Sequence, residues 1–363
     1  MKAPEKRPSP QPPVPPEHLS LGHDASRQQV IRSSPDHWGY LQNLGYSRRV
    51  AGQENNKTVY TASLCYAHIV SKTPCDSDTT FVLGSLSKSM TAPLVASLHD
   101  DGTISSWDAP LKTLLPEFHR EDIYGEIALA DLLTHRTRLA SLDSLWLASN
   151  NPFRTQFIYN NFGYEVLGQV IEKASGETFA EVLRRRLLSP LGLYRTYYTG
   201  ESRENEAKPY AALEDGSIVP TAPPLHGENV LMGPAGGVRS SVNDLLTLYK
   251  AFMGAALHEI IHPDTGSPDQ PKSTIRGINQ LWKGHQSLPF HSFREHSYGF
   301  GWARAQLPAV ISQGSDTSTP NPIVGTGAPS QLALYHGGVI PGFNTYNVLL
   351  PETGSAVVVL TNS

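Results

Sequence analysis

The sequence predicts a mixed α/β (α+β) protein, and two observations support this fold class. Stretches rich in β-branched and aromatic residues lie near both ends of the chain and have the composition of strands. Several segments between them carry apolar residues at helical spacing. Strands at both ends with helices between them indicate one sheet that shares its core with a helical region.

The chain has 363 residues, enough for one large domain or two smaller ones. Its net charge of −4 and the lack of a basic cluster argue against binding to nucleic acid. No apolar run is long enough to cross a membrane. The two cysteines lack C-x-x-C spacing, so no disulfide framework and no cysteine zinc site is implied, and we expect no cofactor.

Residues 1–36 are rich in proline and poor in large apolar side chains, which predicts a disordered tail. This segment has no apolar core of the kind found in secretory signals, so we expect a cytoplasmic protein. Residues 37–363 are predicted to form a single domain. Its sheet would come from about 56–84 and 331–363, with a helical and loop subdomain at about 103–330.

The elements follow from local patterns. Thr58–Ile69 has the composition of a strand, and apolar residues at helical spacing after Ser85 predict a helix that Gly102 ends. A capping box at Ser241 predicts a helix to about Met253, and most of 255–330 is expected to be loop. Further expected helices are Ala128–His135, Phe162–Ala174 and Thr178–Leu188, and further expected strands are Gln331–Tyr335, Thr345–Leu350 and Ala356–Thr361.

The most reactive pattern in the chain is Ser85-Leu-Ser-Lys88 at the start of the predicted helix. Side chains three residues apart on a helix lie on the same face, within reach of each other. A serine hydroxyl is a poor nucleophile until a base takes its proton. A lysine partly removed from water has a lowered pKa and can be that base. The pattern therefore indicates nucleophilic catalysis by Ser85.

Two more motifs follow in order, Tyr159-Asn-Asn161 and His336-Gly-Gly338, and with them the chain resembles the serine β-lactamase-related family. That family includes class C β-lactamases, penicillin-binding-protein-like D-alanyl-peptidases, and related esterases and transesterases. The resemblance extends from about Tyr60 to Ser363 and includes the segments DLLTH, PAGGVRSSVNDL and YGFGW. The sequence of these segments is most similar to that of fungal members, whose relatives act in small-molecule biosynthesis. The resemblance implies a β-lactamase/transpeptidase-like fold.

The resemblance also implies roles. Ser85 would be the acylated nucleophile, Lys88 its proton acceptor and Tyr159 a second base whose phenolate the lysine stabilises. Asn161 would hold a carbonyl or amide on the acyl side of the substrate.

His336 stands where many relatives have a lysine and would be a donor near the leaving group. The backbone N–H groups of Ser85 and Val339 would form the oxyanion hole beside Gly337 and Gly338. The implied substrate is a small-molecule ester, lactone, thioester or amide, released to water or to another acceptor.

Purely structural readings of the same residues remain open. A Tyr-x-Asn pattern before a helix is often only an N-cap with an aromatic neighbour. A histidine before two glycines is often a turn residue. Arg138 replaces a turn glycine of the family. Only 20 residues separate it from Tyr159, fewer than the family usually has, which suggests a deletion in this segment. These departures favour a second hypothesis, an inactive relative that acts as a binding or scaffold protein.

A third hypothesis comes from His258-Glu-Ile-Ile-His262, which fits the H-E-x-x-H pattern of zinc hydrolases. On a helix, two histidines four residues apart face the same side and can bind one metal ion. Pro263 follows directly and disfavours helical geometry at His262, and no third ligand follows at a recognised spacing. We therefore expect no metal here.

The apolar strand Ala356–Thr361 ends the chain. Relatives add a helix that covers this part of the sheet, and a helix at Asp36–Leu44 could replace it only in part. We therefore expect an exposed apolar patch that drives self-association or low stability.

Overall fold

The structure is a computed structural model. It describes the course of the backbone, and for most residues the side chains, over residues 43–48, 57–63, 66–118, 120–138, 152–198, 202–224, 230–262, 274–312 and 321–362. Tyr40–Ser363 form one compact unit. The proline-rich segment 1–36 and the predicted helix from Asp36 up to residue 42 lie outside the described residues.

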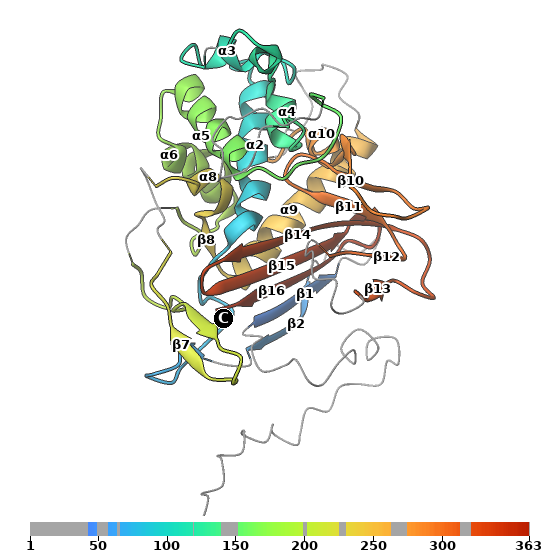
Figure 1. Cartoon of the computed structure of the whole chain (residues 1–363). Coiled ribbons are helices and arrows are strands. Elements are labelled where there is room, and N and C mark those ends of the chain that lie inside the picture. Colours follow the sequence, from blue (N-terminus) through green and yellow to red (C-terminus); the bar gives the residue numbers. More distant parts are fainter. Residues whose placement is uncertain are drawn as a thin grey trace, which may run out of the picture. The chain divides into compact units, whose positions relative to one another are not determined.

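An eight-stranded antiparallel sheet is the centre of this unit (Figure 1). Its strand order is β2-β1-β16-β15-β14-β11-β10-β9, so strands from the two ends of the chain lie side by side. Within the described ranges, four pairs of short strands form separate two-stranded sheets. The strands are β1 (Asn43–Arg48), β2 (Lys57–Ser63), β3 (Tyr66–His68), β4 (Thr73–Pro74), β5 (Phe81–Val82), β6 (Tyr210–Ala212), β7 (Ile218–Pro220), β8 (Arg239–Ser240), β9 (Gln286–Ser287), β10 (His296–Tyr298), β11 (Ala303–Gln306), β12 (Ala309–Val310), β13 (Ile323–Val324), β14 (Leu332–Ile340), β15 (Phe343–Leu350) and β16 (Ser355–Thr361).

The helices form a layer on one face of the sheet and a cluster beside it (Figure 1). α9 packs across β16 and β1, while α2 lies at the centre of the helical cluster and contacts α5, α6, α8 and α10. The helices are α2 (Lys88–Asp100), α3 (Leu111–Leu114), α4 (Leu129–Leu133), α5 (Asn161–Ser175), α6 (Phe179–Leu183), α7 (Ser189–Leu191), α8 (Gly233–Gly236), α9 (Val242–Ile261) and α10 (Ile278–Trp282), with 3-10 turns η2 (Gly84–Ser87), η3 (Ile123–Glu126) and η5 (Pro351–Thr353) and a π-helical turn η4 (Arg184–Leu188).

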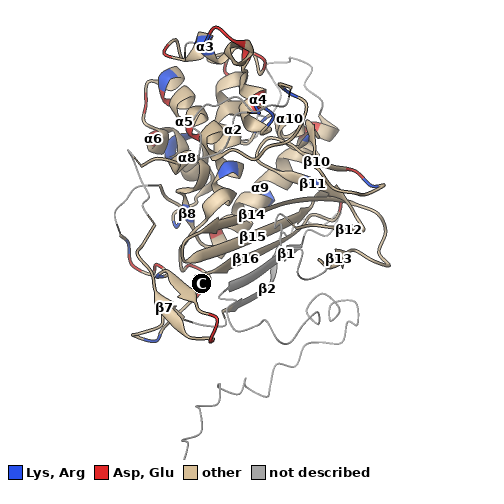
Figure 2. Ribbon diagram, in the orientation of Figure 1, with Lys and Arg blue, Asp and Glu red and all other residues tan. Residues whose placement is uncertain are grey.

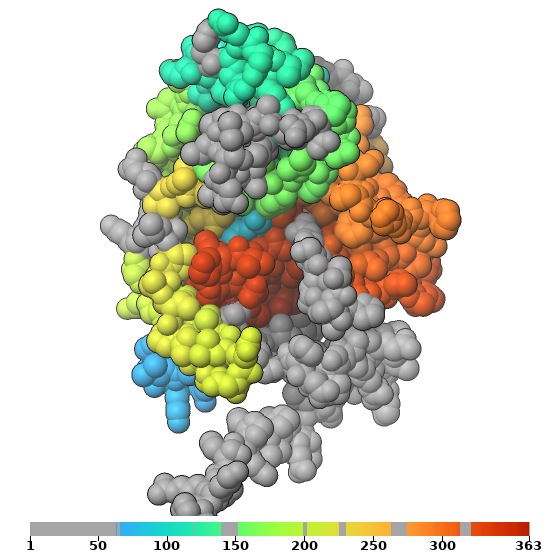
Figure 3. All heavy atoms as spheres, in the orientation of Figure 1, coloured from blue at the N-terminus to red at the C-terminus, as the bar shows by residue number. Residues whose placement is uncertain are grey.

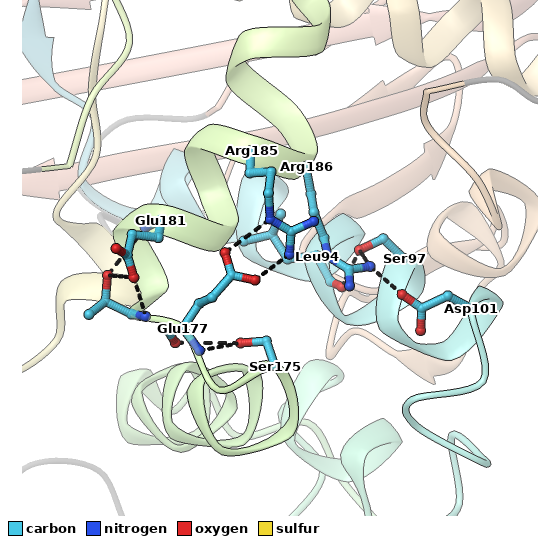
Figure 4. A network of polar contacts seen from close by, with 9 residues as sticks. Leu94, Ser97, Asp101, Ser175, Glu177, Glu181, Arg185 and Arg186 are labelled. Atoms are coloured by element: carbon cyan, nitrogen blue, oxygen red, sulfur yellow. Dashed lines mark hydrogen bonds and ion pairs between the residues drawn. The ribbon is translucent and has the colours of Figure 1, made fainter.

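The C-terminal end of α2 is held to η4 by a polar network (Figure 4). Arg186 donates to Asp101 over 2.6 Å and to the hydroxyl of Ser97 over 3.3 Å. Arg185 pairs with Glu177 at the turn between α5 and α6. The two Arg186 contacts tie the far end of the helix that carries Lys88 to η4.

The two faces of the central strands have different surroundings. On the inner face, Leu334, Leu349 and Val358 are buried in the main core with the helices. On the outer face, Ala333 and Tyr335 belong to a second, smaller apolar cluster with Tyr298 and Ala303. Because side chains alternate along a strand, adjacent residues of β14 contribute to different clusters.

The predicted fold class is confirmed. The helix after Ser85 ends at Asp100, followed by Gly102 with φ +81°, and the helices predicted at 128–135 and 162–174 are present as α4 and α5. The three C-terminal strands are present and longer than expected.

Two predictions of secondary structure were wrong. Asn43 and Leu44, predicted to end a helix, begin β1, which pairs with β16 along its whole length. Most of 255–330 was expected to be loop, yet β9, β10 and β11 extend the main sheet and α10 packs against α9. These strands have two to four residues, too short for an alternating pattern to be recognised.

The expectation for the last strand is corrected in part. β1 pairs with the edge of β16, and Ala356, Val358 and Leu360 are buried on the inner face. Val357 and Val359 on the outer face are half-buried rather than fully exposed. Self-association through this face stays a prediction. Across the described part of the chain, no helix has the length and apolar character needed to cross a membrane.

Candidate active site

Ser85 lies on the 3-10 turn η2, and Lys88 is the first residue of α2. Gly84 precedes the serine with φ +54°, a conformation that residues with a Cβ rarely adopt. This turn directs the serine into a cavity of about 960 Å³, which Ser85, Tyr159 and Asn161 all line.

Lys88 is completely buried and its Nζ atom contacts three oxygens. These are Ser85 Oγ at 3.0 Å, Asn161 Oδ1 at 2.7 Å and the carbonyl oxygen of Ala235 at 2.9 Å. None of the three is a carboxylate, so no full negative charge compensates the loss of water around the amine. Burial therefore lowers the pKa of Lys88 well below its usual range.

Tyr159 donates a hydrogen bond from its hydroxyl to Ser85 Oγ over 2.6 Å. Burial raises the pKa of Tyr159 well above its ordinary value. This direction argues against the phenolate that the resemblance implied, and favours a protonated tyrosine that donates to Ser85. Lys88 Nζ lies 4.9 Å from the centre of the tyrosine ring.

Asn161 is the first residue of α5, but the N-cap of that helix is Asn160, whose side chain accepts the amide hydrogen of Phe162 over 2.9 Å. The capping interpretation of the Tyr-x-Asn pattern therefore applies to the neighbouring residue. Asn161 is half-exposed, so its amide reaches both Lys88 and the cavity.

Gly337, Gly338 and Val339 line the cavity as part of strand β14, rather than the turn that the structural reading suggested. A Cβ atom on Gly338 would collide with the carbonyl oxygen of Leu83 and would lie 3.1 Å from Ser85 N. Glycine is therefore required for β14 to approach the serine this closely. The approach places the backbone of Ser85 beside that of Val339, where the oxyanion hole is predicted.

His336 lies on the inner face of β14, is fully buried and does not line the cavity. Its Nδ1 is 2.6 Å from the carbonyl oxygen of Gly337, and its Nε2 is 2.9 Å from the hydroxyl of Tyr298. Burial, together with the nearby Lys88, lowers the pKa of His336 to about 3. The imidazole is thus neutral and engaged at both nitrogens, which does not fit a direct donor to a leaving group.

The sequence interpretation missed His135, Tyr298 and the carbonyl oxygen of Ala235. His135 Nδ1 accepts the backbone N–H of Asn160 over 3.1 Å, and its ring lies 4.3 Å from that of Tyr159. Each residue lies in a segment that carried the resemblance, DLLTH, YGFGW or PAGG. That position was the available signal, because nothing in the local pattern separates these residues from their neighbours.

Arg138 adopts φ +62°, the region that favours glycine, at the position where the resemblance implied a glycine. Its guanidinium is buried and donates to Gln156 Oε1 over 2.7 Å. The residues between them that would show the proposed deletion, 139–151, lie outside the described ranges.

The H-E-x-x-H motif is more helical than expected, because α9 continues to Ile261 and includes His258 and Glu259. The two carboxylate oxygens of Glu259 accept the backbone N–H groups of Ile278 and Asn279, at 2.9 and 3.0 Å. Glu259 therefore caps α10. The described residues contain no group of three His, Cys, Asp or Glu side chains arranged to hold a metal ion.

A serine, a buried lysine and a tyrosine hydroxyl that meet at one cavity beside an antiparallel sheet define a site of the serine-hydrolase type. The family model described as Beta-lactamase matches residues 46–363. The chain belongs to the beta-lactamase family, a family of serine hydrolases.

Curated relatives include enzymes and penicillin-binding proteins. An unguisins hydrolase of Aspergillus campestris is 26% identical over 318 residues, which cover 79% of this chain and 53% of the hydrolase. The chain thus spans about half the length of that relative. Penicillin-binding protein 4 of Amycolatopsis lactamdurans is 25% identical, with 74% and 75% covered. A beta-lactamase of Pseudomonas fluorescens is 24% identical, with 92% and 93% covered.

Solved structures share the fold. The octameric penicillin-binding protein homologue from Pyrococcus abyssi superposes with a TM-score of 0.67 at 22% identity, covering 89% of this chain and 70% of that one. A class C beta-lactamase from Rhodobacter sphaeroides superposes with a TM-score of 0.65 at 24% identity, covering 89% and 90%.

Proposed function

We propose that the protein is a serine acyl-enzyme hydrolase or acyltransferase that acts on an ester, lactone, thioester or amide of a small molecule. One observation carries the proposal: Ser85 Oγ contacts both Lys88 Nζ, at 3.0 Å, and the hydroxyl of Tyr159, at 2.6 Å, at the wall of a cavity.

Lys88 is the base in this proposal. In its neutral form, which burial favours, its amine takes the proton of Ser85 as Oγ bonds to the substrate carbonyl carbon. Asn161 and Ala235 hold the amine in position before and after it gains the proton. The carbonyl oxygen becomes an oxyanion, stabilised by the N–H groups of Ser85 and Val339. One such donor is typically worth about a hundred- to a thousandfold in rate.

Tyr159 is the proton donor to the leaving group. Its hydroxyl is protonated and already within hydrogen-bond distance of Ser85 Oγ. When the tetrahedral intermediate collapses, the bond to the leaving group breaks and that group takes the proton of the Tyr159 hydroxyl. The ammonium of Lys88 then returns a proton to the tyrosine oxygen. The acyl group then leaves Ser85 by the reverse sequence, with water or another acceptor as nucleophile.

His336 is a positioning residue rather than a catalytic one in this scheme. It joins β14 to Tyr298 through its Nε2 contact, and the tyrosine ring of Tyr298 packs 5.0 Å from that of His135. His135 in turn contacts Tyr159. The buried histidine therefore supports the layer of rings behind the proton donor.

A role in fungal secondary metabolism is the finer part of the proposal. It is supported by the relative named unguisins hydrolase, a protein of Aspergillus. The partner would then be a small-molecule acyl substrate rather than nucleic acid or membrane. An inactive scaffold protein is the competing hypothesis, but the intact Ser85, Lys88 and Tyr159 contacts give no reason for inactivity.

Covalent labelling tests the proposal. The full chain is treated with a fluorophosphonate or with a nitrophenyl ester, and the adduct is located by peptide mass spectrometry. We expect one adduct, on Ser85, that Ser85→Ala abolishes. Ser312→Ala is the matched control, because Ser312 also lines the cavity. No adduct, or an adduct on another serine, would support the scaffold hypothesis.

A further inference from the structure

We propose that the substrate carries an extended, uncharged apolar group, which lies in a trough on the outer face of the sheet. The inference rests on the proposed acyl-enzyme function and specifies the substrate class of the same site. The sheet trough is defined by a floor of Gly337, Tyr346 and Val359 and by apolar walls from Phe157, Leu288, Pro289, Phe290, Tyr298 and Tyr335.

The floor is one cross-strand row. Gly337 pairs with Tyr346, and Tyr346 pairs with Val359, so all three point to the same face of the sheet. Neighbouring strands lie about 4.8 Å apart, so the row extends about 10 Å from Gly337 across β15 to β16. Ser85 lines the same cavity as the three residues, which makes the trough continuous with the predicted reaction centre.

The floor of the trough begins at Gly337. This residue contributes no side chain to the row, so the part of the floor on β14 is bare backbone. Tyr346 and Val359 are half-buried, so their apolar surfaces remain accessible within the cavity. The hydroxyl of Tyr346 donates to the carbonyl oxygen of Ile311, which fixes the ring against the wall.

The trough carries no charge in the described part of the chain. None of the described residues that line the cavity is Asp, Glu, Lys, Arg or His. Strands β14, β15 and β16 contain no Lys, Arg, Asp or Glu, as the tan ribbons of Figure 2 show. In Figure 3 the C-terminal strands (red) reach the surface between the yellow and orange segments, and blue atoms near the start of α2 lie directly above them.

Two buried basic residues close to the reaction centre cannot replace the missing charge. Lys88 and His336 are both fully buried and neither lines the cavity, and His336 is neutral and engaged at both ring nitrogens. A carboxylate in the trough would lose its water without gaining a partner, which is costly. Apolar groups gain from the same burial, by roughly two- to fourfold in binding for each methylene removed from water.

The test compares nitrophenyl esters of increasing chain length on the full chain. We expect kcat/KM to rise roughly two- to fourfold per added methylene from acetate to octanoate. A nitrophenyl hemisuccinate, which carries a carboxylate on its acyl group, should be turned over at least tenfold more slowly than the butyrate ester.

Val359→Trp should fill the trough and reduce octanoate turnover to near the acetate level, with acetate turnover changed less than twofold. Val357→Trp is the matched control, because Val357 lies on the same strand and face but does not line the cavity. If the tryptophan variants do not fold, Val359→Thr keeps the side-chain shape and should lower octanoate turnover several-fold without changing acetate turnover.

The outcomes separate the two proposals. No acetate turnover and no labelling of Ser85 would contradict the proposed function itself. Acetate turnover with a flat chain-length profile, equal effects of Val357→Trp and Val359→Trp, or efficient hydrolysis of the hemisuccinate would each overturn the trough while leaving the acyl-enzyme function in place.

Discussion

Two short motifs place reactive side chains on helices, but the tertiary structure surrounds the two motifs with different neighbours. Ser85 and Lys88, at the start of α2, meet Tyr159 and Asn161 from α5 and Ala235 from α8 at one cavity. His258 and Glu259, near the end of α9, meet no further ligand among the described residues, and Glu259 caps α10. Spacing on a helix brings two groups together, but chemistry depends on what other elements add.

The largest effects should come from the α2 motif. We expect Lys88→Met and Tyr159→Phe each to slow acylation by about a hundred- to ten-thousandfold, because each removes a positioned proton-transfer group. Pre-steady-state release of nitrophenol measures acylation, and inhibitor binding measured separately should change far less. A Tyr159→Phe variant at the wild-type rate would show that this hydroxyl only packs against Ser85.

A smaller effect on rate is expected from His135, which acts through Tyr159. His135 accepts the N–H of Asn160 through its ring and the N–H of Ile158 through its carbonyl oxygen, so it holds the backbone on both sides of the tyrosine. We expect His135→Ala to lower kcat about ten- to a hundredfold with little change in KM, because small displacements of catalytic groups are costly. His135→Asn, whose amide oxygen can accept the same N–H, should restore part of the rate. Equal rates for the two variants would contradict the positioning role.

Stability in acid should distinguish buried from exposed histidines. Burial lowers the pKa of His135, and it lowers that of His336 to about 3, whereas an unfolded histidine titrates near 6.5. Below pH 6.5 the unfolded chain therefore binds protons that the folded chain does not. For His336, the free energy of unfolding should fall by roughly 1 kcal/mol per pH unit as the pH decreases from 6.5 toward 3, and His135 adds to this slope in the same direction.

Urea unfolding at several pH values measures this slope. His336→Asn should reduce it, whereas His291→Asn, at an exposed position, should leave it unchanged. A slope that is the same in all three proteins would show that His336 is not buried and neutral in the folded state.

The smallest effect is expected from the α9 motif. Glu259→Gln weakens the acceptors for two N–H groups at the start of α10, and loss of a helix cap typically costs about 1 kcal/mol. We expect a lower melting temperature with unchanged kcat/KM at temperatures where both proteins are folded. Loss of activity on chelation, restored by zinc and absent in His258→Ala, would instead establish a metal site.

The sequence alone identified the helix after Ser85, the strands at the C-terminus and the residues Ser85, Lys88, Tyr159 and Asn161 that the structure brings together. These predictions rest on local rules: helical spacing, β-branched composition and the order of three motifs. They also needed the resemblance, because nothing local to residues 85 and 159 indicates that they meet.

Only the tertiary structure determined the direction in which individual side chains point. His336 and Gly337 are neighbours in β14, yet the histidine points into the core and the glycine opens onto the cavity, since successive residues of a strand face opposite sides. Which side is the core depends on α9 and on strands far away in the sequence. For the same reason β1 and β9–β11 could not be predicted: they are strands because of the partners they pair with, and those partners are distant in the chain.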